Sequence, residues 1–299
     1  MQGRLLTAVL SVWLASVLLS AGLAHKALYL PPAFRPRAEP ALAGQLARWG
    51  RGWEPAEVLS TDGARLKGWY FPASGPDAVI LLHGVADSRR GMSSYARMLL
   101  QNGYSVLVPD SRGHGESGGE PLSYGWRERH DVVRWVDWLE QRCHPRGIFG
   151  LGVSMGAAIL LQTLPLEPRI RAAVAEAPFV TFREVAYHRL AQASGLPGPL
   201  SFALSTILVE QAFLYTKIRF GIDLAAVSPR KAVIESATPV LFIHGLQDTN
   251  IPPAHSVELA RLRGSKLWLA PGAQHVQVLA VAPAEYQRRV LEHFAQSTP

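Results

Sequence analysis

The stretch from Gly150 to Gly156 constrains the fold of this chain more than any other part of the sequence. The apolar residues before it predict the end of a buried strand, and the small and aliphatic residues 157–161 behind it predict a helix. Between strand and helix lies the pattern G-x-S-x-G, in which Ser154 stands between Gly152 and Gly156. A serine on so sharp a turn requires neighbours with almost no side chain, and the two glycines meet that requirement.

Such a turn would project the Ser154 hydroxyl out of the sheet and place the backbone N–H of Met155 where an oxyanion forms. The three glycines of the stretch also fit a loose dinucleotide-binding loop, with Glu176 at roughly the spacing of its acidic residue. That loop belongs to the first strand–helix turn of a domain, whereas two strand–helix units precede Ser154 here. We therefore favour a nucleophilic serine over a nicotinamide-binding loop.

The other apolar runs predict an α/β fold with a mostly parallel, eight-stranded sheet and helices on both faces. Two alternating runs around the Asp-Gly turn at 61–63 indicate an opening hairpin. After the hairpin, strand patterns alternate with helix patterns. The expected strands are 56–60, 66–71, 78–82, 104–108, 148–151, 170–177, 239–244 and 266–269, and the expected helices include 95–100, 132–139 and 283–295.

One connection in this pattern is far too long to be a simple loop. About sixty residues between Ala177 and Pro239 carry no strand signal, whereas connections usually have about 2–6 residues. Residues 200–214 within this connection are apolar and predict a helix. We interpret residues 180–237 as an inserted helical lid. Its apolar side chains could pack against the domain, or could form an acyl-chain pocket or an entry that faces a membrane.

Two polar residues follow the last two predicted strands, at the edge of the sheet where Ser154 lies. Asp248 comes after the first of these strands and His275 after the second. An acyl-transfer serine needs a base within hydrogen-bond reach and a carboxylate that orients the base. The chain order Ser, Asp, His is the order that accompanies this serine turn. Glu176, at the end of the strand before the lid, is the alternative position for the acid.

The strand at 78–82 ends in His83-Gly84, which leads into Val85. The backbone N–H of Val85 can face that of Met155 across a developing oxyanion, so the pair is a candidate oxyanion hole. We expect His83 to hold this turn through hydrogen bonds of its side chain.

Four segments together resemble the α/β-hydrolase superfamily, and more narrowly its membrane-tethered serine hydrolases of the prolyl-oligopeptidase-like and lysophospholipase-like group. The resemblance covers roughly residues 55–295 and is specific for the fold rather than for a substrate. The segments are Leu81-Leu82-His83-Gly84, Pro109-Asp110-Ser111-Arg112-Gly113-His114-Gly115-Glu116-Ser117, Gly152 to Gly156, and Leu241-Phe242-Ile243-His244-Gly245 with Asp248.

The resemblance implies that Ser154 is the nucleophile, His275 the general base and Asp248 the acid that orients it. It also implies that the N–H groups of Val85 and Met155 bind the oxyanion. The family usually has Gly-x-Gly-His or a similar pattern at the histidine, whereas alanine and glutamine precede it here. The assignment of the histidine stands despite this difference.

These residues predict a serine hydrolase that cleaves carboxylic esters, including lipid esters or thioesters, through an acyl-enzyme. A serine peptidase of the prolyl-oligopeptidase-like type and a catalytically inactive binding module of the same fold are the alternatives. The expected reaction needs no cofactor. We assign no metal, because no pair of candidate ligands has metal-binding spacing with a third partner.

Residues 5–24 form an uninterrupted apolar or small run of about the length that spans a bilayer. The run exceeds the usual apolar region of a signal peptide, so we predict that residues 1–26 are an uncleaved single-pass membrane anchor. A signal peptide cleaved after Gly22-Leu23-Ala24, which would give a secreted protein, is the alternative. Positive charges on both sides leave the membrane side undetermined. A Pro- and Arg-rich connector at 27–50 would lead to the hydrolase domain at 51–299.

The formal net charge of +7 comes mostly from arginines that are spread along the chain. Because they form no basic cluster, the sequence does not indicate binding to nucleic acid, whereas contact with an anionic membrane surface fits. The single cysteine, Cys143, excludes a disulfide framework and a cysteine metal cluster.

Overall fold

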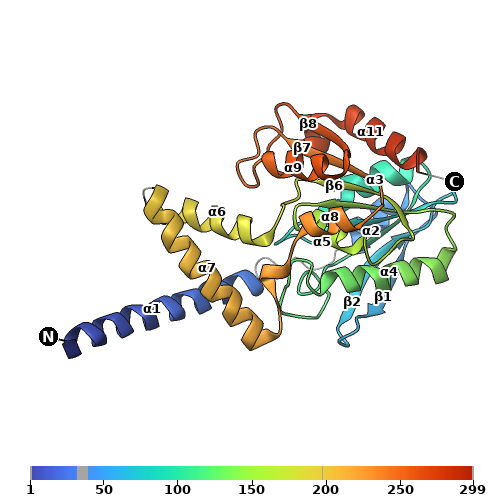
Figure 1. Cartoon of the computed structure of the whole chain (residues 1–299). Helices are drawn as coiled ribbons and strands as arrows, with labels where there is room; N and C mark the ends of the chain where they lie inside the picture. Colours follow the sequence, from blue (N-terminus) through green and yellow to red (C-terminus); the bar gives the residue numbers. More distant parts are fainter. Residues whose placement is uncertain (1, 32–39, 197, 298–299) are drawn as a thin grey trace.

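The computed structural model describes residues 2–31, 40–196 and 198–297 of the 299-residue chain. Its centre is an eight-stranded sheet with the order β1-β2-β4-β3-β5-β6-β7-β8 (Figure 1). The first strands, β1 (Glu54–Leu59) and β2 (Arg65–Phe71), form an antiparallel hairpin, and β2 is also antiparallel to β4 (Ser105–Pro109). All further pairs in the sheet are parallel.

The predicted mostly parallel, eight-stranded sheet is confirmed, and each strand begins and ends within two residues of its expected position. In the central strands every residue of β3, β4 and β5 is buried, because helices cover both faces of the sheet. The remaining strands are β3 (Ala78–Leu82), β5 (Ile148–Val153), β6 (Ile170–Glu176), β7 (Val240–Gly245) and β8 (Lys266–Ala270).

The helices divide between the two faces of the sheet. On one face, Leu46, Leu99 and Phe294 pack into a core with the strands. On the other face, Trp135 and Leu160 belong to the second core. The first face carries α2 (Pro40–Ala47), the short η2 (Arg89–Met92), α3 (Ser93–Gln101), α10 (Val278–Val281) and α11 (Pro283–Ala295); the second carries α4 (Glu128–Cys143), α5 (Met155–Thr163), α8 (Pro229–Glu235) and α9 (Ala254–Arg263).

The expected connector at 27–50 differs from a purely extended segment. Residues 32–39 lie outside the described part of the chain, but Pro40–Ala47 form helix α2. Ala43 and Leu46 of this helix are buried in the core beneath α3. The folded body therefore begins before residue 51. The physical reason is the pair of apolar residues three positions apart, which share one face of a helix.

The stretch 180–237, interpreted from the sequence as a lid, consists in its described residues of helices joined by turns. It contains α6 (Phe182–Ser194), α7 (Gly198–Phe220), the short η3 (Leu224–Ala226) and α8. Figure 1 shows α6 and α7 projecting from the body of the sheet, beside α1 (Gln2–Leu28). A third apolar cluster joins these elements, with Leu28, Phe182 and Phe213 among its members.

The apolar N-terminal run is a helix whose last turns belong to the folded body. Leu28 is fully buried, and the carbonyl oxygens of Ala27 and Leu28 accept hydrogen bonds from the Tyr124 hydroxyl (2.7 Å) and the Leu122 N–H (3.0 Å). These contacts satisfy carbonyls that a helix end leaves without intrahelical partners. Within α1, residues Val9–Leu28 are long and apolar enough to cross a membrane.

The turn between β5 and α5 depends on two close approaches of backbone. A Cβ added at Gly152 would lie 2.5 Å from the carbonyl oxygen of Gly156, and one at Gly156 would lie 2.2 Å from that of Leu82. Real side chains do not tolerate such distances, so only glycine lets α5 start directly over the end of β3.

We expect Gly156→Ala to lower the free energy of unfolding by about 1–3 kcal/mol or more, because the added methyl group collides with backbone that cannot rotate away. Gly44→Ala in α2 is the matched control, since nothing lies within 4 Å of its added Cβ and alanine favours a helix. Denaturant unfolding of both variants in the same detergent would check this. Equal midpoints for the two variants would contradict the close packing at Gly156.

Candidate active site

Ser154 occupies the predicted sharp turn, between the last residue of β5 and the first residue of α5. Its φ and ψ angles are 52° and −116°, a conformation that is strained for any residue other than glycine. The Ser154 N–H donates a hydrogen bond of 2.8 Å to the carbonyl oxygen of Glu176 at the end of β6. The neighbouring strand thus holds the strained residue in place.

The structure brings Ser154, His275 and Asp248 into one chain of hydrogen bonds. His275 Nε2 lies 2.9 Å from Ser154 Oγ, and His275 Nδ1 lies 2.6 Å from Asp248 Oδ2. With the proton on Nδ1, the imidazole donates to the carboxylate and can accept the serine proton at Nε2. These residues come from three separate loops at the carboxyl edge of the sheet, after β5, β7 and β8.

Asp248 is held as an anion by the groups around it. Its Oδ1 accepts hydrogen bonds from the N–H groups of Asn250 (2.8 Å) and Ile251 (2.9 Å), and His244 Nε2 lies 3.2 Å from Oδ2. Burial alone would raise the pKa of this carboxyl group, but the hydrogen bonds from His244, His275 and Ile251 hold the pKa well below its usual range.

Glu176, the alternative acid predicted from the sequence, has a different set of partners. Its carboxyl group accepts hydrogen bonds from the hydroxyls of Tyr95 (2.9 Å) and Tyr286 (2.9 Å) and from the N–H of Val278 (3.2 Å). Both ring nitrogens of His275 are already bonded to Asp248 and Ser154. Glu176 is fully buried, which raises its pKa. It joins the end of β6 to the loop that carries His275.

The two predicted oxyanion donors lie at the same site. Met155 is the first residue of α5, so its N–H has no carbonyl partner within the helix. A Cβ added at Gly84 would lie 3.5 Å from the Cβ of Ser154, which places the turn leading into Val85 directly beside the serine. Val85, Met155 and Ser154 all line one pocket.

His83 holds this turn as predicted. Its Nδ1 lies 2.7 Å from the carbonyl oxygen of Gly84, and its Nε2 accepts a hydrogen bond of 3.0 Å from the N–H of Ser111. Because an Nε2 that accepts leaves the proton on Nδ1, the ring is neutral. Complete burial lowers the pKa of His83 to about 4, which agrees with a neutral ring.

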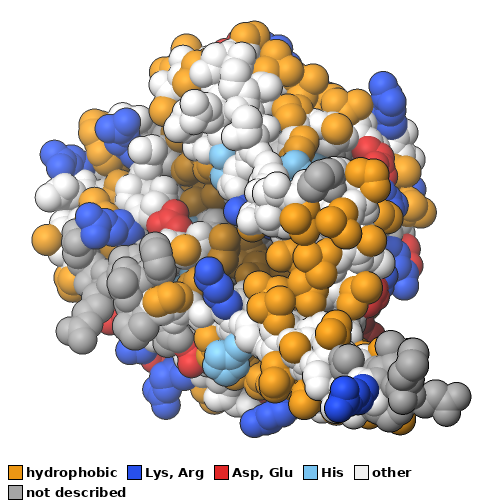
Figure 2. Space-filling model, turned by 90° about the vertical axis from the view of Figure 1, so that its left-hand side faces the viewer, with side chains coloured by type: hydrophobic (Ala, Val, Ile, Leu, Met, Phe, Trp, Pro, Cys, Tyr) orange, Lys and Arg blue, Asp and Glu red, His pale blue; other side chains and the backbone are white. Residues whose placement is uncertain are grey.

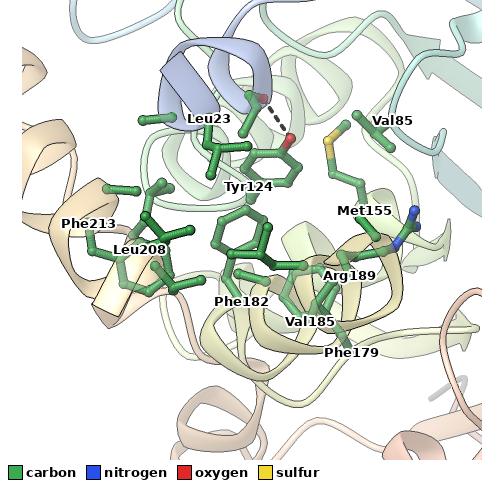
Figure 3. A pocket seen from close by; sticks show the side chains of 18 of the residues that line it. Leu23, Val85, Tyr124, Met155, Phe179, Phe182, Val185, Arg189, Leu208 and Phe213 are labelled. Atoms are coloured by element: carbon green, nitrogen blue, oxygen red, sulfur yellow. Dashed lines mark hydrogen bonds between the residues drawn. The ribbon is translucent and has the colours of Figure 1, made fainter. Parts of the chain in front are cut away.

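A pocket of about 380 Å³ opens beside Ser154, and its walls are mostly apolar. Figure 2 shows the hollow in the face formed by the projecting helices, with hydrophobic side chains on its floor. In Figure 3, Phe182 and Tyr124 lie at the centre of the pocket, with Leu208 and Phe213 on one side and Met155 on the other. Such a pocket suits an apolar chain whose polar end lies at the serine.

Helix α1 supplies part of the pocket wall, a contribution that sequence reasoning missed. Leu23, Ala24 and Ala27 all line the pocket together with Ser154. The dashed line in Figure 3 marks the hydrogen bond from the Tyr124 hydroxyl to Ala27 that fixes the end of this helix there. No motif marks such residues, because alanine and leucine are the ordinary content of any apolar helix.

Among the described residues that line the pocket, Arg189 on α6 carries the one charged side chain, and none is Asp or Glu. Figure 3 shows Arg189 beside Met155, on the opposite side of the pocket from Phe213. In the described part of the chain, no group of three His, Cys, Asp or Glu residues is arranged to hold a metal ion.

The chain resembles known proteins over most of its length. A family model described as "Serine aminopeptidase, S33" matches residues 75–202, which include the serine turn. The uncharacterized protein YqkD of Bacillus subtilis (strain 168) is 32% identical over 241 residues, covering 79% of this chain and 77% of YqkD. The lysophosphatidylserine lipase ABHD12 of Danio rerio is 29% identical over 214 residues, covering 67% of this chain and 50% of that protein.

Among solved structures, the esterase Pf2001 of Pyrococcus furiosus has a TM-score of 0.71 at 24% sequence identity, covering 90% of this chain and all of the esterase. At this level of identity the likeness concerns the fold. Together with the sheet order and the relationship to YqkD, it shows that this chain belongs to the α/β-hydrolases, a family that includes esterases and lipases.

Proposed function

We propose that this protein is a serine esterase that hydrolyses medium- or long-chain acyl esters at a membrane. The observation that carries the proposal is the hydrogen-bonded chain of Ser154, His275 and Asp248 at the end of an apolar pocket. A positioned nucleophile with its base and acid performs acyl transfer, and the adjoining pocket can hold the acyl chain.

In the first half of the reaction, His275 Nε2 takes the Ser154 proton while Oγ attacks the ester carbonyl carbon. The tetrahedral oxyanion accepts hydrogen bonds from the N–H groups of Val85 and Met155. The C–O bond to the alcohol then breaks, and the imidazolium of His275 returns its proton to the leaving alkoxide. In the second half, His275 removes a proton from water as the water oxygen attacks the acyl-enzyme. The bond between the acyl carbon and Oγ then breaks, the imidazolium returns its proton to Ser154 Oγ, and the carboxylic acid is released.

Asp248 acts on this cycle through His275. The anionic carboxylate fixes the tautomer that leaves Nε2 free to accept a proton, and it stabilises the imidazolium that forms in each half-reaction. The low pKa of Asp248 keeps it ionised while the charge on His275 changes. The buried Glu176 positions the histidine loop through Val278 and is not the acid in this proposal.

The pocket supports an acyl chain rather than a peptide as the bound group. An aminopeptidase must bind a substrate ammonium group, which requires a carboxylate or other acceptors near the nucleophile. Among the described residues that line the pocket, the charged one is Arg189, whose charge repels an ammonium group. The description of the matching family favours peptidase activity, but the apolar lining favours esters, including lipid esters and thioesters. The complete hydrogen-bonded chain argues against an inactive binding module.

Helix α1 supports a retained anchor rather than a cleaved signal peptide. Cleavage after Ala24 would remove Leu23 and Ala24 from the pocket wall, and with them the hydrogen bonds of Ser16 and Ser20 to Gln211 on α7. We therefore assign residues 1–26 to a membrane anchor that also completes the pocket, and 180–237 to a lid over it.

Replacing Ser154 with alanine removes the attacking oxygen, so we expect kcat on p-nitrophenyl octanoate to fall by about 10⁴-fold or more. Labelling of the protein by a fluorophosphonate probe should disappear in the same variant. The control is Ser74→Ala, which changes an exposed serine in the loop after β2. Persistent hydrolysis and labelling in a folded Ser154→Ala protein would remove Ser154 from the proposal.

Two carboxyl variants separate the acid from the positioning residue. Asp248→Asn should lower kcat by about 10³–10⁴-fold, because the amide cannot hold the imidazole in the productive tautomer. Glu176→Gln should cost at least about tenfold less, since the glutamine oxygen can still accept from Val278. Steady-state kinetics on one ester would test this, with thermal midpoints as the check on folding. A larger loss for folded Glu176→Gln than for Asp248→Asn would exchange the two roles.

The pocket predicts a dependence on acyl-chain length. We expect kcat/KM on p-nitrophenyl esters to rise from acetate to octanoate or decanoate as more apolar surface is buried. Ala212 lines the pocket, so the larger side chain of Ala212→Trp should fill part of the space for the acyl chain. We expect this variant to lower the decanoate-to-butyrate ratio of kcat/KM by at least about tenfold. A wild-type enzyme active on acetate alone would contradict an acyl-chain pocket.

A further inference from the structure

We propose that the outer face of helix α7 lies in the surface of a lipid bilayer beside α1, so that the pocket beneath α7 opens at the membrane. The consequence of this inference for catalysis rests on the proposed function.

The outward face of α7 carries an apolar stripe whose side chains are exposed on both sides of the point where α1 crosses it. Exposed side chains recur there at intervals of four, three, seven and four residues, which keeps them on one face of a helix. Ile207 is 53% exposed, Leu214 is 59% exposed and Ile218 is 77% exposed. The stripe consists of Leu200, Leu204, Ile207, Leu214 and Ile218.

The opposite face of the same helix belongs to the pocket. Leu208, Val209, Ala212 and Phe213 are buried and line the cavity beside Ser154. Helix α7 is therefore apolar on two faces, one against the catalytic body and one against the surroundings. The boundary of the outer face is polar, since Glu210 is paired with Arg183 on α6. An apolar face of this size on a soluble protein would be an aggregation liability.

Helix α1 crosses this outer face at the middle of the stripe. Gln211 lies there between Ile207 and Leu214, and its side chain accepts a hydrogen bond from Ser20 (3.0 Å) and donates one to Ser16 (3.1 Å). The two helices are thus fixed at a crossing, which Figure 1 shows beside the body of the sheet.

The position of this crossing indicates which partner covers the outer face of α7. At the level of Ser16 and Ser20, the α1 side chains Leu18 and Leu19 are 65% and 54% exposed. The segment from Gln2 to Leu19 rises about 27 Å at 1.5 Å per residue, close to the hydrocarbon thickness of a bilayer. A bilayer that covers α1 as far as Leu19 therefore also reaches the stripe on α7. Lipid is the occupant that this geometry favours over a second copy of the chain.

The consequence is a pocket with its mouth at the lipid surface. The walls from α1 and α7 end where their outer faces meet the bilayer, so an acyl chain can move from lipid to pocket without crossing water. The substrate class that this arrangement admits is a single- or double-chain lipid ester held in the membrane.

Site-specific fluorescence on the full-length chain tests the location of the stripe. In a Cys143→Ser background, single cysteines at positions 207 and 214 would carry the polarity-sensitive dye NBD, in vesicles of phosphatidylcholine and phosphatidylglycerol. Position 234 is the matched control, because Ile234 on α8 is 52% exposed and lies away from α1 and α7. We expect blue-shifted emission and quenching by acyl-chain doxyl lipids at 207 and 214, and neither at 234.

Two results would overturn the proposal. Dye at 207 and 214 that is quenched by aqueous iodide as strongly as at 234 would show a water-exposed stripe. Blue-shifted dye that doxyl lipids do not quench would show that protein, such as a second copy, covers the stripe. Loss of ester hydrolysis with intact doxyl quenching would count against the proposed function alone.

Charge variants connect the stripe to turnover. Ile207→Glu and Leu214→Glu should lower hydrolysis of a long-chain ester embedded in vesicles by at least about tenfold, while hydrolysis of soluble p-nitrophenyl butyrate stays at the wild-type rate. Neither side chain lines the pocket. Ile234→Glu should leave both rates unchanged. Equal effects of Ile207→Glu and Ile234→Glu on the vesicle substrate would contradict a role of the stripe in substrate entry.

Discussion

The strained turn at Ser154 is the constraint on which the rest of the site depends. Two glycines allow the backbone of β5, α5 and β3 to approach closely, and Glu176 of β6 accepts the Ser154 N–H. A residue with φ of 52° persists only when the surrounding structure holds it there, and here the two neighbouring strands β3 and β6 contribute. The same turn points Oγ at His275 and puts the first N–H of α5 next to it, where we propose that it binds the oxyanion.

The polar groups around this turn differ in what they hold. His83 fixes the turn before Val85, Asp248 fixes His275, and Glu176 fixes the loop that follows the histidine. Each is buried and fully hydrogen-bonded, which is how a protein interior tolerates such groups. The division explains why two carboxyl groups at one sheet edge have opposite pKa shifts: Asp248 faces histidines, whereas the burial of Glu176 outweighs its two tyrosine partners.

The apolar half of the site comes from two elements that lie far apart in the sequence, the N-terminal helix and the long connection after β6. Helix α1 and the long connection after β6 meet over the serine and build the pocket between them. In the α/β-hydrolase family the sheet positions the chemistry, and insertions on the sheet decide which substrate reaches it. The membrane anchor that we propose is consistent with this division, since the helix that would tether the protein is also a wall of the pocket.

The sequence by itself determined the sheet and the residues at its carboxyl edge. Strands appear in the sequence as alternating or fully apolar runs, and the serine turn contains its own two glycines. Short segments were therefore enough to predict β1 to β8 and Ser154. Asp248 and His275 follow because strand ends in a parallel sheet share one edge. Helix α2 was not predicted, because its short apolar pattern is too weak to distinguish a helix from a connector. The partners of Glu176 were not predicted either, because they lie about a hundred residues away in the sequence and meet it only in the folded chain.

Only the tertiary structure decided that Leu23, Ala24 and Ala27 complete the pocket and that α7 is apolar on two faces. Leucine and alanine read the same in a signal peptide, a membrane span or a pocket wall, because hydrophobic burial is non-directional. What distinguishes these cases is the partner, here the hydrogen bonds of Tyr124 and Gln211 across about a hundred residues or more of sequence. Those contacts exist only after the chain has folded.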